Sequence, residues 1–278
     1  MKFNLRTLGP REAHAVLTLR EQDRTVVRFD DLRALAPTES SARGLTKALV
    51  RKGWLVRAKG GTYLLQPPEL GPENFGENNP GLLATTAVTP SYVGWWSAAS
   101  RHGFTTQVPA TVFVATQRRV PNREFEGTRV RFIAISQQKF FGFANVRVLG
   151  REVPTSTPAK TFIDCLDRVD LCGGPAELTR IADRALATVP TQEIFDAAIR
   201  FGSKVVLQRL GFLSDFVKRP FSDELRSALR AAIPKSARSR FGRRRGLEGN
   251  IGYVHEWGLY VDAEREDLLC EVPRLRNC

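Results

Sequence analysis

The segment from Glu39 to Leu65, ESSARGLTKALVRKGWLVRAKGGTYLL, places an amphipathic helix directly before a β-hairpin. At about 100° per residue, one side of the predicted helix is apolar and holds Ala42, Leu45, Ala48 and Leu49. The opposite side carries small residues and cations, with the cations prevailing towards its end: Ser40, Arg43, Gly44, Lys47 and Arg51. None of these five polar-side residues is an acid, so the face is positively charged.

Turn and cap residues delimit both elements. Pro37 ends the preceding helix, and Thr38 or Ser40 can cap the new one. Gly53 then ends it. The runs WLVRA and TYLLQ flank the sequence KGG at 59–61, which is the pattern of two short strands joined by a tight turn.

Two further helices and a short strand precede this segment. The first helix, PREAHAVLTLREQ (Pro10 to Gln22), has apolar residues at helical spacing, namely Ala13, Val16, Leu17 and Leu19. TVVRF is a brief β-prone run, and DDLRALA (Asp30 to Ala36) is a second short helix. The order helix, strand, helix, helix, hairpin predicts a winged helix-turn-helix, whose third helix enters the major groove of DNA. The alternative is a small helical domain with a solvated basic face.

The whole chain fits a basic protein of two domains. It has 278 residues and a net charge of +13, with 42% hydrophobic and 26% charged residues. There is no run of membrane-spanning length, and MKFNLRTLGPRE lacks the apolar part of a signal peptide, so we expect a cytoplasmic protein without a membrane partner. The charge favours nucleic acid as the partner, although an acidic protein would also suit it.

We predict a winged-helix domain at 1–66, a linker at 67–80 and an α+β domain at 81–278. The stretch QPPELGPENFGENNPG (66–81) is rich in Pro, Gly and Asn. Beyond it, a helix at 91–101 carries the apolar residues Tyr92, Trp95, Trp96 and Ala99, which are predicted to pack in a core. ATVFVATQ, TRVRFIAIS and VRVLGREVP are three extended segments, and the first two are separated by a basic turn, RRVPNREFEG.

The second half of the larger domain is predicted to be helical. Five helices are expected, at about 157–168, 176–187, 191–200, 205–217 and 222–233. An arginine-rich loop, KSARSRFGRRRG, and a strand-like end, HEWGLYVD, follow them. The predicted fold class is therefore α+β, with a winged helix followed by a small sheet and a helical half.

The residue patterns do not point to an enzyme, a metal or a cofactor. The four cysteines and three histidines lack the spacing of a zinc site or a disulfide framework, and Cys165 is expected to be a small buried hydrophobe. Thr157 and Lys160 have the S-x-x-K spacing of β-lactamase-like enzymes, but Thr157 followed by proline is also a helix start. We expect capping. A metal-dependent nuclease remains the alternative, because VDAERED (261–267) offers carboxylates.

Three motifs, together with the winged helix, resemble the AbiEi family: SYVGWWSAASRHGF (91–104), VPTSTPAKTFIDCLDR (153–168) and LQRLGFLSDF (207–216). AbiEi proteins are antitoxins of type IV toxin–antitoxin systems in abortive infection, and actinobacterial members, including mycobacterial ones, are common. The similarity extends over nearly the whole chain up to HEWGLYVD. The winged helix alone does not single out this family.

The resemblance implies that the N-terminal domain represses its own operon by binding inverted repeats in double-stranded DNA. It also implies that the second domain counteracts a nucleotidyltransferase toxin, generally without a long-lived complex. The DNA-contacting positions that match the family are Ser40, Ser41, Arg43, Lys47 and Arg51 on the helix, with Arg57 and Lys59 on the wing. Two classes of function therefore stay open: a repressor and antitoxin without chemistry of its own, and a winged-helix nuclease.

Overall fold

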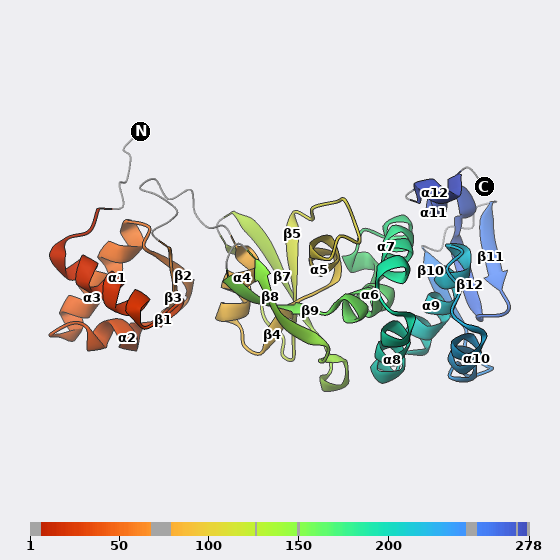
Figure 1. Cartoon of the computed structure of the whole chain (residues 1–278), viewed down its shortest axis with the longest axis horizontal. Helices are drawn as coiled ribbons and strands as arrows, with labels where there is room; N and C mark the ends of the chain where they lie inside the picture. The colour runs from red at the N-terminus through yellow and green to blue at the C-terminus, as the bar shows by residue number, and fades with distance from the viewer. Residues whose placement is uncertain are drawn as a thin grey trace. The chain divides into compact units, whose positions relative to one another are not determined.

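The computed structural model describes residues 7–67, 79–125, 127–148, 151–242, 249–270 and 272–276. They form an α+β fold, as predicted, and divide into two compact units (Figure 1). The first unit contains Met1–Pro90, Arg123–Val130 and Arg147–Val153, and the second contains the remaining residues.

The N-terminal part of the first unit has the predicted order of helix, strand, helix, helix and hairpin. Its helices are α1 (Pro10–Glu21), α2 (Phe29–Ala34) and α3 (Glu39–Arg51). Its strands are β1 (Val26–Arg28), β2 (Leu55–Lys59) and β3 (Thr62–Leu65), paired antiparallel in the order β1-β3-β2. Gly61 closes the β2–β3 turn at a φ of 72°, in the left-handed region that glycine adopts without strain.

A small hydrophobic core joins these elements. Its buried residues are Val16, Leu19, Val27, Leu32, Leu49, Trp54, Leu55, Tyr63 and Leu65. One predicted core position is wrong, because Leu17 is 67% exposed while Ala15 is buried. Leu45 is half-buried and packs against the core as predicted, and Thr46 beside it is also buried. The Thr46 hydroxyl donates to the Ala42 carbonyl at 2.8 Å, and this bond lets a polar residue replace an apolar one in the packed face.

The rest of the first unit begins at α4 (Pro80–Ala87), which is buried along most of its length. Residues 68–78 of the predicted linker lie outside the described residues. Asn79 caps α4, and its side-chain oxygen accepts the N–H of Leu82 at 3.1 Å. The first unit thus continues past residue 66 along the chain, to Pro90, and includes two later segments.

A six-stranded sheet has the order β6-β7-β5-β4-β9-β8. These strands are β4 (Ser91–Val93), β5 (Thr111–Thr116), β6 (Arg123–Phe125), β7 (Thr128–Ala134), β8 (Phe143–Val148) and β9 (Arg151–Ser156). β6 lies inside the predicted basic turn, and the predicted third extended segment is divided between β8 and β9. Turn-forming residues in both segments are the reason why the sequence pattern did not predict β6 or the division between β8 and β9.

The helix predicted at 91–101 starts later than expected. Ser91–Val93 is strand β4, and α5 covers Trp95–Arg101. Tyr92 is aligned with Ala115 of β5, and Val93 is aligned with Thr155 of β9. Pairing along both edges of β4 stabilises the extended form against the helical spacing of the sequence. Trp95 and Ala99 are buried as predicted.

The helical half of the second unit matches the prediction to within a few residues. Its helices are α6 (Pro158–Asp167), α7 (Pro175–Thr188), α8 (Thr191–Phe201), α9 (Lys204–Phe216) and α10 (Asp223–Ala231). They enclose one large hydrophobic core that also includes Cys165, which is fully buried, as predicted. None of the described helices is both long and apolar enough to span a bilayer.

The chain ends in a second small sheet and two short helices. The strands are β10 (Ser239–Gly242), β11 (Asn250–Val254) and β12 (Leu259–Glu264), in the order β10-β12-β11. The helices are α11 (Arg265–Leu269) and α12 (Pro273–Arg276). Part of the predicted arginine-rich loop is thus strand β10, whereas residues 243–248, including its arginine triplet, lie outside the described residues.

Candidate nucleic-acid interface

Helix α3 is held at both ends by the residues that the sequence suggested. Thr38 is its N-cap, and the Thr38 hydroxyl oxygen accepts the Ser41 N–H at 3.2 Å. Gly53, at a φ of 72°, lets the chain turn directly into the hairpin. Between these ends Ala42, Thr46 and Leu49 face the core. Ser40, Arg43, Lys47 and Arg51 are exposed.

The cations of α3 and the wing meet around one hollow of about 510 Å³. It is lined by Phe29, Arg43, Thr46, Lys47, Val50, Arg51, Arg57 and Tyr63. We call it the four-cation hollow, after Arg43, Lys47, Arg51 and Arg57. No acid is among these lining residues. The Arg57 guanidinium carbon lies 5.9 Å from the centre of the Tyr63 ring, so this wing residue is oriented by an aromatic contact.

Glu39 is the acid nearest to this cationic face along the helix. Arg43 donates to the Glu39 carboxylate from Nη2 at 2.6 Å and from Nε at 3.1 Å. The two side chains are 73% and 57% exposed. An exposed pair at this spacing contributes only about 0.3–0.5 kcal/mol, so it does not prevent Arg43 from turning to another anion.

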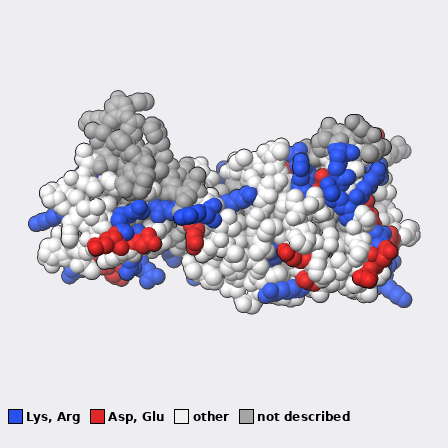
Figure 2. Space-filling view, in the orientation of Figure 1, with Lys and Arg blue, Asp and Glu red and all other residues white. Residues whose placement is uncertain are grey.

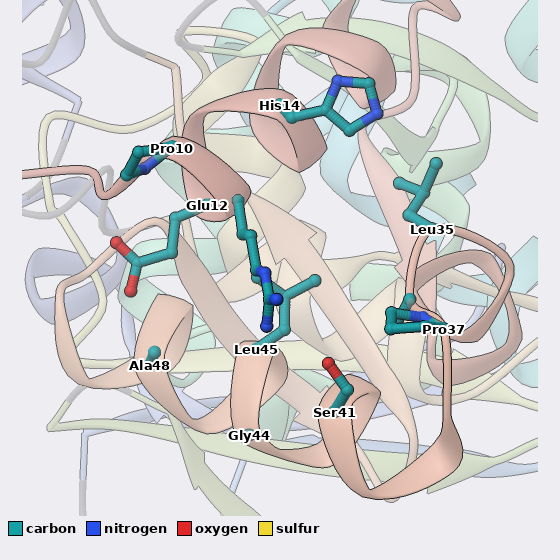
Figure 3. Close-up of a pocket in the computed structure, with 11 residues that line it drawn as sticks. Pro10, Glu12, His14, Leu35, Pro37, Ser41, Gly44, Leu45 and Ala48 are labelled. Carbon is teal, nitrogen blue, oxygen red and sulfur yellow. The ribbon is translucent and has the colours of Figure 1, made fainter.

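The other three predicted contacts lie outside the four-cation hollow. Ser40 and Lys59 are exposed, and Ser41 is half-buried. Ser41 lines a separate hollow of about 620 Å³ between α1, residues 35–37 and α3. Figure 3 shows Ser41, Gly44 and Ala48 along α3, with Pro10, Glu12 and His14 of α1 on another side of this hollow. The structure therefore brings together four of the seven predicted residues.

Arg151 contacts the three-stranded sheet of the N-terminal segment, and the sequence pattern did not predict this contact. Its guanidinium donates to the Thr25 hydroxyl at 2.9 Å and to the Leu65 carbonyl at 2.7 Å. These partners lie 126 and 86 positions away in the sequence, and nothing local marks the pair. All three residues belong to the first unit. Arg151 thus fixes β3, one strand of the wing, from outside the N-terminal segment.

The TPAKTFID motif holds the fold together. Thr157 caps α6 as predicted, and its hydroxyl accepts the Lys160 N–H at 3.4 Å. The Lys160 ammonium is 1% exposed, donates to the Tyr92 hydroxyl at 2.9 Å and is paired with Asp164. Burial lowers the pKa of Lys160, and it raises the pKa of Asp164. Lys160 is thus part of a buried polar cluster with Tyr92 and Asp164.

A second arginine-rich hollow, of about 500 Å³, lies in the second unit near α7. Figure 2 shows Lys and Arg side chains gathered over α7 and α11. Asp183 accepts from Arg219 at 2.8 Å and from Arg274 at 2.7 Å. Burial raises the pKa of Asp183, but these hydrogen bonds outweigh it and hold that pKa below its ordinary value. Arg219 and Arg274 therefore link α7 to the segment after α9 and to α12.

Comparisons with known proteins bear on the fold. No protein-family model matches the chain, and no curated protein matches it. The crystal structure of the RV2827C protein from Mycobacterium tuberculosis superposes with a TM-score of 0.67, at 19% sequence identity, over 96% of each chain. At this identity the likeness concerns the fold alone. Among the described residues, no group of three or more His, Cys, Asp or Glu side chains is placed to hold a metal ion.

Proposed function

We propose that the N-terminal part of this chain is a winged helix that binds double-stranded DNA through α3 and the wing. The observation that supports it is the four-cation hollow, which combines three cations of α3 with one of β2. An α-helix fits the major groove of B-DNA, and cations beside it neutralise phosphates on either side. The exposed position of Arg43 and Lys47 leaves them available for such contacts.

The direct test replaces Arg43 and Lys47 together by alanine. Neither side chain is buried, so the fold should be kept, while affinity for a duplex of the chain's own promoter should fall at least about tenfold. Arg184→Ala with Lys204→Ala is the matched control, because it removes two exposed cations from the second unit. Normal promoter binding by the Arg43 and Lys47 variant would remove α3 from the interface.

The resemblance to AbiEi antitoxins extends this proposal to a biological role. The protein then represses transcription of its own operon at inverted repeats, and it also counteracts a nucleotidyltransferase toxin encoded beside it. The full-length Arg43→Ala, Lys47→Ala variant separates the two activities. In cells it should lose repression of a promoter reporter but still restore growth when the toxin is expressed from an independent promoter. Loss of both activities in a folded variant would contradict separate functions. Failure of the original protein itself to restore growth in this assay would make repression the whole antitoxin effect.

A further inference from the structure

The small C-terminal sheet has one packed face and one outward face. Phe241, Leu259 and Val261 are fully buried and point into the core. On the outward face, Arg240 of β10 is aligned with Tyr260 of β12, and Tyr260 is aligned with Tyr253 of β11. Neighbours in register on adjacent strands lie side by side, so these three side chains form a row across the sheet.

Neighbouring aromatic rings lie along this row, and a guanidinium group lies against each of its two tyrosines. The ring centres of Tyr253 and Tyr260 are 4.6 Å apart, and His255 lies 4.6 Å from Tyr253. The guanidinium of Arg240 lies 5.1 Å from the Tyr260 ring, and that of Arg238 lies 5.5 Å from the Tyr253 ring. Arg238, Arg240, Tyr253, His255 and Tyr260 are together called the aromatic row.

Cross-strand pairing alone would stabilise the sheet, but it does not require this exposure or charge. Tyr260 is 40% exposed, and His255, on the other ring neighbour Tyr253, is also exposed. Arg240 is paired with Asp262 at 2.7 Å. Arg238 donates to the carbonyls of Lys235 and Ala237, and no acid is paired with it in the described part of the chain. The aromatic row thus offers ring faces together with unneutralised positive charge.

We infer that the aromatic row binds single-stranded nucleic acid. Unpaired bases can stack on exposed tyrosine and histidine rings, while arginines contact the phosphates between them. In a duplex the base faces are covered by neighbouring base pairs, so the row selects single strands. This site lies in the second unit and is independent of the duplex-binding proposal for α3.

The test uses the full-length protein and fluorescein-labelled single strands of about ten nucleotides, oligo(dT) and oligo(U), in anisotropy titrations. Tyr260→Val keeps a residue of high strand propensity in β12 and removes the ring, so binding should weaken at least about fivefold. Tyr260→Phe keeps the ring and should bind within about twofold of the original protein. The ratio of the two oligonucleotide affinities distinguishes DNA from RNA as the source of the strand.

Further variants test whether the effect is specific to the aromatic row. Arg238→Gln, outside the strands, should weaken single-strand binding and reduce its salt dependence, whereas Arg184→Gln on α7 should change neither. Tyr260→Val should bind duplex promoter DNA normally, and the Arg43→Ala, Lys47→Ala variant should bind single strands normally. Unchanged single-strand binding by both Tyr260→Val and Arg238→Gln would overturn the inference. Failure of the original protein to bind either oligonucleotide would overturn it equally.

Discussion

The Lys52 ammonium at the end of α3 donates to the Glu12 carboxylate in the first turn of α1, with 2.5 Å between Nζ and Oε2. The same oxygen accepts the Gly9 N–H at 2.7 Å. The two side chains are 22% and 14% exposed. One carboxylate therefore fastens the C-terminal end of the proposed recognition helix to α1.

Glu12→Gln should lower the free energy of unfolding at neutral pH by about 1–2 kcal/mol, because the charge-assisted bond to Lys52 is lost. Burial raises the pKa of Glu12, but the hydrogen bonds from Lys52 and Gly9 outweigh it and place that pKa below its ordinary value of 4.5. Because the pKa of Glu12 is lower in the folded state, its carboxylate stabilises the folded protein fully above pH 4.5. This stabilisation is lost as the pH falls through the folded-state pKa. Denaturant melts at several pH values should show the two proteins converging in acid; a constant difference would contradict this.

Glu39→Gln should strengthen duplex binding about two- to fivefold, because it frees Arg43 and removes a negative charge facing the phosphates. The cost to α3 should stay below about 1 kcal/mol, since this first-turn acid is well exposed. Promoter titrations measure the affinity, with Glu21→Gln on α1 as the control. Unchanged binding by Glu39→Gln would place this end of α3 away from the DNA.

Duplex affinity should depend steeply on salt. If all four cations of the four-cation hollow meet phosphates, a plot of log affinity against log salt has a slope near roughly −3.6, at about 0.9 per phosphate. The Arg43→Ala, Lys47→Ala variant should lose about half of that slope. Titrations at four or more salt concentrations give both values. A nearly flat line for the original protein would assign its +13 charge to another partner.

Lys160→Met should destabilise the second unit by about 3–5 kcal/mol, because it leaves the Asp164 carboxylate buried without its cation. The double variant Lys160→Met, Asp164→Leu should recover much of that loss, since no buried charge remains. Thermal and denaturant unfolding measure both effects. If the double variant is no more stable than the single one, the pair is not the source of the cost.

Several features of this protein could be predicted from local sequence because local forces decide them. The cap at Thr38, the glycine turns at Gly53 and Gly61 and the amphipathic spacing of α3 are set by backbone sterics and helical period. They were enough to predict the winged-helix order and to identify the charged face that carries Arg43, Lys47 and Arg51.

Tertiary structure decided what depended on partners far along the chain. Ser91–Val93 became a strand because it pairs with β5 and β9, although the spacing of the apolar residues from Tyr92 to Ala99 predicted a helix. The contacts Lys52–Glu12 and Arg151–Leu65 join residues that are 40 and 86 positions apart. Ser41 and Arg43 are close in sequence but line different hollows. Tyr253, Tyr260 and Arg240 became a row only when strand register aligned them. Hydrogen bonds between distant segments fix these arrangements, and the residue spacing within a single segment cannot predict such bonds.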